Sequence, residues 1–377
     1  MKAKLKRAAL VMFTVVLVLI VSACGGDGGG GGGTDSNAEG GTGEVFTFTA
    51  NYHGPNTIAP GMGMVDAVKK VEEDSGGRIK ITPYFDGTYV AYDESIQATI
   101  NDVVDICYVD AGNLNEVFYA NRLLSAPLKC DIPSWDGAHT VMNQILEQIP
   151  EIAKELEDVG LVWIGIGSYG GSVLHLKNDQ VVTKPEQLKG MSINTAADAT
   201  ALLGSCGAEA TNTSATEFYT VLERGIVDGW LHNWGAFNSF KCVEVTKAHT
   251  VFTSEENATQ DATGLWSAAG GYVMNKEKYD SLPDDLKQVI KESFGDYAMT
   301  AWGDYEKPNA EQGFEAAKAA GHTITYLDQE QLLPWKDAIA QSVPSILDAC
   351  KKDGIDSYAI YDKICELMQA QYDKEHA

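Results

Sequence analysis

The feature that most constrains the fold is the alternation of strand-like and helix-like segments along the chain. Residues 161–167 form an almost continuous apolar run, which is typical of a central strand buried on both faces. Residues 62–75 instead place apolar side chains at helical spacing and end at a Gly-Gly pair. Because this alternation continues along the chain, the sequence predicts an α/β fold with mostly parallel sheets.

The stretch over residues 185–234 predicts a compact α/β unit whose last strand carries polar and aromatic groups. Two short strands, near 191–194 and 208–210, each precede a helix, and a third strand begins at Ile226. The end of this third strand carries Trp230, His232, Asn233 and Trp234. Because ligands of α/β folds usually lie at the carboxyl ends of strands, we expect half of a ligand site here.

The N-terminus predicts an exported chain that is anchored by a lipid. A basic start precedes an apolar run over residues 8–21, which is short for a membrane span and right for a signal peptide. The run ends in Val-Ser-Ala-Cys, which resembles a bacterial lipobox; an ordinary signal peptide with an incidental cysteine is the alternative. We expect a signal peptide over 1–23, lipid attachment at Cys24, a Gly-rich disordered tether over 24–44, and a position outside the cytoplasm on the cell membrane.

Composition and motifs exclude several classes of function. The chain has 53 acidic and 28 basic residues, a formal net charge of −25, so its surface should repel nucleic acid. It lacks a Gly-x-Ser-x-Gly elbow, an HExxH motif and a histidine cluster with metal-ligand spacing. The sequence therefore gives no support to an enzyme, and we expect no cofactor, metal or nucleic-acid partner.

Six cysteines follow Cys24, and none has the CxxC spacing of zinc or thioredoxin-like sites. Cys107 lies in a predicted buried strand and is expected to be a core residue. An exported chain permits disulfides, and a bridge between Cys350 and Cys365 would join two consecutive C-terminal helices. The six are Cys107, Cys130, Cys206, Cys242, Cys350 and Cys365.

Several segments together resemble the solute-binding proteins of tripartite ATP-independent periplasmic (TRAP) transporters, the DctP-like family. Each segment alone is a weak signal, but their order and spacing cover nearly the whole chain after the tether. The segments are Gly-Gly-Arg-Ile-Lys-Ile at 76–81, Val-Val-Asp-Ile at 103–106, Pro-Glu-Gln-Leu-Lys-Gly-Met at 185–191, Glu-Phe-Tyr at 217–219, Gly-Ile-Val-Asp-Gly at 225–229, Val-Met-Asn-Lys at 273–276 and Ser-Leu-Pro at 281–283.

The resemblance implies a two-lobed periplasmic-binding-protein-like fold, in which two α/β domains are joined by hinge strands and a long helix spans both. Helical periodicity over 286–320, with Pro308 as a kink, fits that helix. The lobes would close around a small organic solute and deliver it to TRAP membrane permease subunits; presentation to a membrane sensor is the alternative. We expect domain I over 45–166 and 255–285, and domain II over 167–254 and 286–377.

The chain departs from this family at Asn194. The family usually carries an arginine there, which forks onto the carboxylate of the solute. An asparagine offers a donor and an acceptor but no charge, so we expect a neutral, aromatic or amphipathic solute. The alternative is a carboxylate held by other donors, such as His232, Lys177 or backbone N–H groups, and Arg122 also stays open as a donor.

The other candidate ligand-binding residues follow the same reasoning, because they lie at or near predicted strand ends. Trp230 and Trp234 either stack on the solute or belong to the interdomain core. His175 is expected to be a satisfied histidine of the sheet. The full set is Tyr52, His53, Tyr89, Asp110, Asn113, Tyr169, Asn194, Asn212, Trp230, His232, Asn233 and Trp234.

Overall fold

The computed structural model describes residues 44–114, 118–195, 199–213, 217–255, 257–259, 267–352 and 354–377. The predicted signal peptide, Cys24 and nearly all of the predicted tether lie outside these residues. Within the described part of the chain, no helix has both the length and the apolar character needed to cross a membrane.

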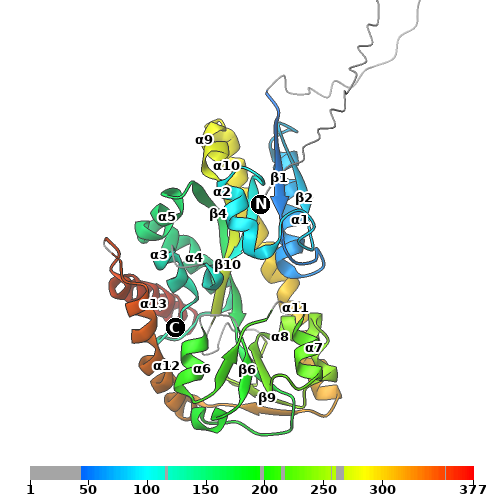
Figure 1. Ribbon diagram of the computed structural model, residues 1–377, viewed down its shortest axis with the longest axis vertical. Coiled ribbons are helices and arrows are strands. Elements are labelled where there is room, and N and C mark those ends of the chain that lie inside the picture. Colours follow the sequence, from blue (N-terminus) through cyan, green and yellow to red (C-terminus); the bar gives the residue numbers. More distant parts are fainter. Residues whose placement is uncertain are drawn as a thin grey trace, which may run out of the picture. The chain divides into compact units, whose positions relative to one another are not determined.

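The fold consists of two lobes, each built on its own sheet (Figure 1). The sheet of lobe I has the order β2-β1-β3-β10-β4. Only β10 runs antiparallel to its neighbours among these strands. The strands are β1 (Phe46–Asn51), β2 (Ile79–Tyr84), β3 (Ile106–Asp110), β4 (Leu161–Gly171) and β10 (Ser267–Asn275), and the helices around them include α1 (Ala59–Asp74), α2 (Ser95–Ile100), α3 (Tyr119–Arg122), α4 (Trp135–Gln148), α5 (Pro150–Glu157), α9 (Lys276–Ser281) and α10 (Asp284–Lys291).

The sheet of lobe II has the order β11-β9-β5-β8-β6-β7. Here β5 is the antiparallel member of the described strands. The prediction of mostly parallel α/β sheets is therefore confirmed. The strands are β5 (Val173–Leu176), β6 (Ser192–Asn194), β7 (Glu209–Thr211), β8 (Gly229–His232), β9 (Ala248–Val251) and β11 (Thr323–Tyr326), with helices α6 (Thr200–Ser205), α7 (Phe218–Glu223) and α8 (Trp234–Ser239).

Two strand connections and one long helix join the lobes. β4 leads through Ser172 directly into β5, and the chain returns to lobe I between β9 and β10. Helix α11 (Ala298–Ala319) packs on α1, α4 and β4 of lobe I and on α8 of lobe II. A π-helical turn over Glu292–Tyr297 connects it to α10, and Pro308 lies inside it. The sequence therefore placed the long helix correctly.

Two expected domain limits differ from the structure. The limit after residue 166 falls inside β4, because β4 pairs with β10 as far as Gly171. The C-terminal helices also divide: α12 (Gln329–Ala349) packs on α6 of lobe II, whereas α13 (Ser357–Glu375) packs on α4 and α3 of lobe I. The sequence does not show which lobe each of these helices joins, because both helices have apolar faces that either lobe could bury.

Three large apolar clusters, and a small one of Val90, Ala98 and Val104, hold the described residues together. One lies under the helices of lobe I around Met64, Tyr272 and Trp302, and one lies in lobe II around Trp230 and Phe237. The largest runs from β3 and α4 of lobe I to α6, α12 and α13. Cys107 belongs to this third cluster, as predicted, and no disulfide joins the cysteines of the described residues.

Candidate functional site

The carboxyl ends of the parallel strands in both sheets lie at the crossing between the lobes. In lobe I, β1 ends at Asn51 and β3 ends at Asp110. In lobe II, β6 ends at Asn194 and β8 ends at His232. His232 pairs with Val173, the first residue of β5, directly after the chain has crossed from β4. The two edges therefore meet where the chain passes from one sheet to the other. We call these facing edges the candidate site.

Asp110 is the centre of a tyrosine cluster at the lobe I edge. Its carboxylate accepts hydrogen bonds from the hydroxyls of Tyr92 at 2.8 Å, Tyr108 at 3.0 Å and Tyr169 at 2.6 Å. Tyr108 and Asp110 share one face of β3 because side chains alternate along a strand. Hydrogen bonds to a charged acceptor are stronger than neutral ones, so the cluster fixes all three rings around the carboxylate.

Tyr52 and His53 extend this cluster from the end of β1. The His53 ring lies 4.1 Å from the ring of Tyr92, and the Tyr52 ring meets that of Tyr108 edge-on at 5.1 Å. Burial lowers the pKa of His53, although the charge of Asp110 opposes this shift. The Nδ1 atom of His53 is buried without a hydrogen-bond partner among the described residues. A neutral imidazole with one unused nitrogen therefore lies at this edge.

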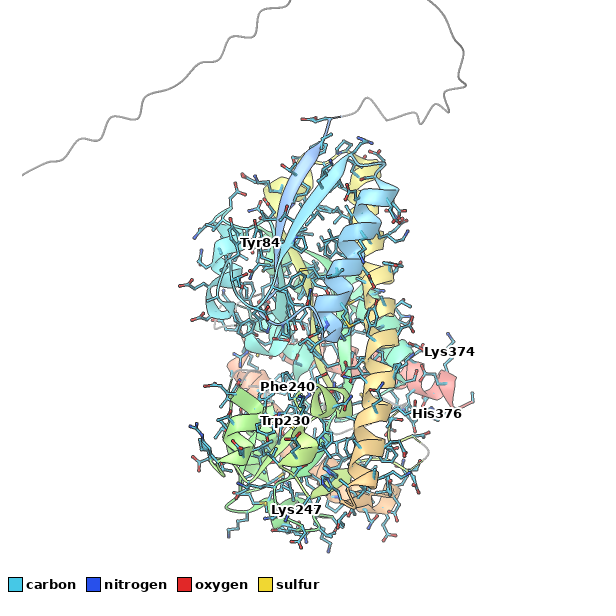
Figure 2. All side chains as sticks on the ribbon, turned by 90° about the vertical axis from the view of Figure 1, so that its right-hand side faces the viewer. Tyr84, Trp230, Phe240, Lys247, Lys374 and His376 are labelled. Atoms are coloured by element: carbon cyan, nitrogen blue, oxygen red, sulfur yellow. The ribbon has the colours of Figure 1, made fainter. Side chains whose placement is uncertain are left out.

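An aromatic group forms the lobe II edge at the end of β8. The Trp230 ring lies 4.8 Å from the rings of both Phe218 and His232. Burial lowers the pKa of His232 to about 4, so this histidine is neutral at pH 7. Trp230 is fully buried, and Figure 2 shows it with Phe240 inside lobe II, away from Tyr84 of lobe I. Trp230 thus supports the edge from within the core of lobe II.

Asn194 lies next to Trp230, since these two residues pair in the register of β6 and β8. The amide is only 1% exposed, and its Nδ2 donates to Thr213 Oγ1 at 2.9 Å. Its Oδ1 is buried without a hydrogen-bond partner among the described residues. At the position that the sequence singled out, the site therefore offers a neutral acceptor.

Asn233 connects the two edges. As N-cap of α8 it accepts from the Ala236 N–H at 2.7 Å, and its Nδ2 donates to the Tyr169 carbonyl oxygen at 2.6 Å. Tyr169 in turn donates its hydroxyl to Asp110. A continuous path of hydrogen bonds thus runs from the first turn of α8 in lobe II to the tyrosine cluster of lobe I.

The remaining predicted residues are buried in a core, exposed beside the outer strands β2 and β7, or beyond what the structure describes. Trp234 is buried in the core between α8 and α11, where its ring lies 5.5 Å from that of Phe314. Tyr89 is 44% exposed and stacks on Tyr84 at 4.5 Å. Asn212 is exposed just after β7. The side chain of Asn113 lies outside the described residues.

Lys177, which the sequence offered as an alternative donor, follows the end of β5 that lies far from the candidate site. β5 is antiparallel to β8, so its last residue pairs with Gly229 at the start of β8. The Lys177 ammonium donates instead to the Glu223 carbonyl oxygen at 2.8 Å. Strand direction therefore removes this lysine from the candidate site.

Sequence reasoning missed Tyr92, Tyr108 and Phe218. Tyr108 could have been found, because it lies two residues before Asp110 on a strand and must share its face. Tyr92 precedes α2, and Phe218 begins α7. Both reach the edges only when the whole lobe is folded, so no local sequence pattern indicates them.

His175 is hydrogen-bonded inside the sheet, as predicted. Its Nδ1 lies 2.9 Å from Nδ1 of His249, and His249 Nε2 lies 3.0 Å from Nδ1 of His322. The three rings use their nitrogens for one another and for the His232 carbonyl oxygen. Within the described residues, no group of three or more His, Cys, Asp or Glu side chains is arranged to hold a metal ion.

Comparison with known proteins finds similarity to bacterial solute-binding proteins. The family model described as "Bacterial extracellular solute-binding protein, family 7" matches residues 56–349. A solute-binding protein of Chromohalobacter salexigens is 21% identical over 308 residues, which are 78% of this chain and 85% of that protein.

Solved structures of TRAP solute-binding proteins share the fold. One from a marine metagenome, specific for aromatic acid ligands and bound to metahydroxyphenylacetate, has a TM-score of 0.75 and 22% identity, covering 87% of this chain and 99% of the other. One from Rhodoferax ferrireducens, with copurified benzoate, has a TM-score of 0.73 and 21% identity, covering 88% and 100%. One from Chromohalobacter salexigens, with bound D-glucuronate, has a TM-score of 0.69 and 18% identity, covering 86% and 100%.

Proposed function

Because the chain belongs to family 7 of the bacterial extracellular solute-binding proteins, we propose that it captures one small organic solute between its two lobes and delivers it to the permease of a TRAP transporter. The process is reversible binding without turnover. In the open arrangement the lobes admit the solute, and in the closed arrangement both edges of the candidate site contact it. The solute favours the closed arrangement only by the contacts that it makes there and not in the open one. The permease recognises the closed, loaded form.

The observation that carries this proposal is a set of buried polar atoms without partners at the facing edges. Buried polar groups in folded proteins are nearly always hydrogen-bonded, so each exception calls for a specific reason. A solute held between the lobes would satisfy these atoms, and sites of this kind combine apolar walls with a few such groups. Among the described residues at these edges they are His53 Nδ1, Asn194 Oδ1 and Thr195 Oγ1.

We further propose a neutral solute with an aromatic or amphipathic body and a hydrogen-bond donor. The unused Oδ1 of Asn194 accepts a donor, whereas a carboxylate has none to offer. The Asp110 carboxylate at the opposite edge also disfavours an anion. Two of the arginines in the described residues are unsuited to bind a carboxylate here, because Arg78 pairs with Asp285 and Arg224 is exposed after α7. Arg122 is half-buried and stays open as a donor.

Matched pairs of solutes test this choice. We expect 3-hydroxybenzyl alcohol to raise the unfolding temperature more than 3-hydroxybenzoate, and glucose more than glucuronate, because ligands of the native state stabilise it by mass action. Thermal shift gives the ranking and calorimetry gives the dissociation constants. Tight, selective binding of the acids would overturn the neutral-solute proposal and favour the alternative, a carboxylate held by His232, Arg122 or backbone N–H groups.

Replacing Asn194 by Leu, which has a similar volume, should weaken binding of the best neutral solute at least about tenfold, since one buried hydrogen bond is lost. Gln288→Leu removes an exposed amide of α10 that donates to Glu292 in the adjacent π-helical turn, and it serves as the matched control. Calorimetry on both variants measures the change. Equal affinity of N194L and the natural protein would remove Asn194 from the site.

The membrane anchor and the receiving protein are further parts of the proposal. We propose that Cys24 carries the lipid; a labelled fatty acid should be incorporated into the natural chain and not into Cys24→Ser. Presentation to a membrane sensor is the alternative to uptake. Two permease genes beside the gene for this chain support uptake, whereas a sensor-kinase gene in that place supports the alternative.

A further inference from the structure

Cys130 and Cys365 are held opposite each other on different elements. The two neighbours of Cys130 are fixed to helix α13: the Lys129 N–H donates to the Tyr361 hydroxyl oxygen at 3.0 Å, and the Asp131 N–H donates to Gln369 Oε1 at 3.0 Å. Residues four apart on a helix lie on the same face. Cys365 is four residues from both Tyr361 and Gln369, so it faces Cys130.

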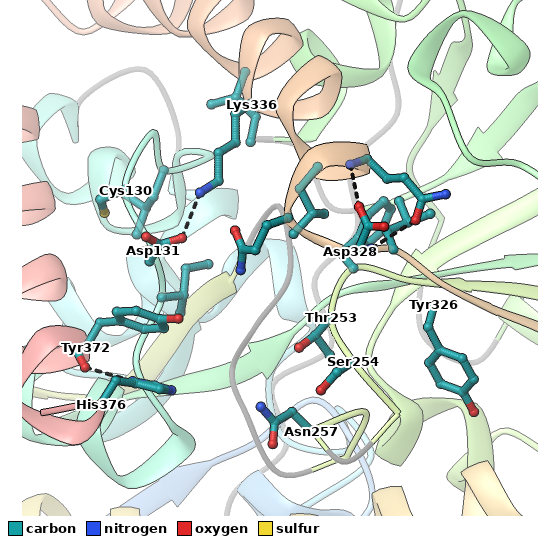
Figure 3. A pocket seen from close by; sticks show the side chains of 18 of the residues that line it. Cys130, Asp131, Thr253, Ser254, Asn257, Tyr326, Asp328, Lys336, Tyr372 and His376 are labelled. Atoms are coloured by element: carbon teal, nitrogen blue, oxygen red, sulfur yellow. Dashed lines mark hydrogen bonds and ion pairs between the residues drawn. The ribbon is translucent and has the colours of Figure 1, made fainter.

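The chemical environment of this pair favours reaction between the two sulfurs. The neighbouring Cys130 thiol, with Tyr361 and Lys129, holds the pKa of Cys365 below its usual value, whereas Cys365 and burial raise the pKa of Cys130. Cys365 is 5% exposed, whereas Cys130 lines a cavity of about 630 Å³ (Figure 3). A reagent can therefore approach Cys130 through the cavity, with Cys365 behind it.

We propose that Cys130 and Cys365 form an intramolecular disulfide once the chain is outside the cytoplasm. Cys130 passes its proton to the neighbouring Cys365 sulfur and attacks a disulfide oxidant, such as an exported thiol oxidase or oxidised glutathione. A mixed disulfide forms at Cys130 and one oxidant thiolate leaves, which takes the proton from Cys365 and restores the Cys365 thiolate. The Cys365 thiolate then attacks the Cys130 sulfur and expels the second oxidant thiol. The cysteine pair loses two protons and two electrons, which reduce the oxidant disulfide to two thiols. Oxidising compartments favour this state.

The bridge would fasten the last helix to the lobe on which it packs. Cys130 lies in the segment just before α4, and α13 already packs on α4. Near this segment, Lys336 of α12 donates to Asp131 at 2.7 Å (Figure 3). The sequence alone offered Cys350 as one possible partner of Cys365 and left the pairing open. The hydrogen bonds on both sides of Cys130 assign Cys130 instead.

Peptide mapping of the exported full-length chain tests the pairing directly. The chain is unfolded in the presence of iodoacetamide, so that every free thiol is blocked, and it is then cut with trypsin without reductant. We expect the peptide 130–154 joined to the peptide 364–374 in the natural protein and in Cys350→Ser, and its loss in Cys130→Ser and Cys365→Ser. Alkylation of both cysteines in the natural protein, or a link between Cys365 and Cys350, would overturn the proposal.

Thermal unfolding tests the role of the bridge without requiring a solute. A reductant should lower the unfolding temperature of the natural protein and of Cys350→Ser by about 5 °C, because a cross-link over a long loop restricts the unfolded chain. The double variant Cys130→Ser/Cys365→Ser should not respond. An unchanged unfolding temperature in the natural protein would overturn the stabilising role of the bridge.

Discussion

Replacing Glu306 by Gln should stabilise the folded protein by about 3 kcal/mol at pH 8.5 and by less than about 1 kcal/mol at pH 5. Glu306 lies on α11, is 7% exposed, and approaches the first turn of α8: a Cβ atom on Gly235 would lie 1.8 Å from its Oε1. Burial raises the pKa of this carboxyl to about 7. The natural protein must therefore hold a buried charge at alkaline pH.

The sign follows from proton binding. The unfolded chain releases the Glu306 proton near pH 4.5, whereas the folded chain keeps it until about pH 7. Between these values the folded state binds more protons, so stability falls as the pH rises from 4.5 to 7 and stays low above it. The glutamine side chain of E306Q is neutral at every pH, so the variant escapes this loss.

Urea unfolding at pH 5, 6.5 and 8.5, without solute, measures the difference between the two proteins. The buried His139, His232 and His249 have lowered pKa values, so they destabilise the fold as the pH falls below 6.5. These histidines are present in both proteins, so their contributions cancel in the difference between the two free energies of unfolding. Glu311→Gln, on an exposed position of the same helix, is the control and should change stability by less than about 0.5 kcal/mol at each pH. A pH-independent difference for E306Q would show that Glu306 stays charged in the fold.

Replacing Gly165 by Ala should destabilise the protein by about 3 kcal/mol. Gly165 lies in β4 against the π-helical turn before α11, where a Cβ atom would lie 2.0 Å from the Phe294 carbonyl oxygen and 3.0 Å from the Gly295 nitrogen. Both are backbone atoms of a packed turn, so no side chain can rotate away to relieve the overlap. Either β4 or the turn must move. β4 leads directly into lobe II, and the turn leads into α11, which packs on both lobes.

Gly204→Ala is the matched control for this prediction. Gly204 lies in α6, where a Cβ atom would have no neighbour within 4 Å. Alanine has the higher helix propensity, so this variant should gain about 0.5–1 kcal/mol. Urea unfolding at one pH compares both variants with the natural protein. If G165A unfolds within about 1 kcal/mol of the natural protein, β4 is not pressed against the turn as the structure has it.

Part of the candidate site could be predicted from the sequence. Asp110, Asn194 and His232 end strands, and strand ends follow from local patterns and from the topology of α/β folds. The link from Asn233 to Tyr169 could not be predicted, because it joins residues 64 apart through a helix cap and a crossing strand. The same applies to Trp234: its local pattern fits a strand exit, but packing of α11 on α8 buries it in the core.

The sequence by itself determined which segments are strands and which are helices, because side-chain periodicity and Gly or Pro signals are local properties of the chain. Together with the family resemblance, it also indicated two lobes and a long spanning helix. Only the tertiary structure decided that β10 lies between β3 and β4, that Lys177 lies at the far end of β5, and that Cys365 faces Cys130. Each of these depends on contacts between residues far apart in the chain, and these contacts contribute free energy only when the lobe that contains them is folded.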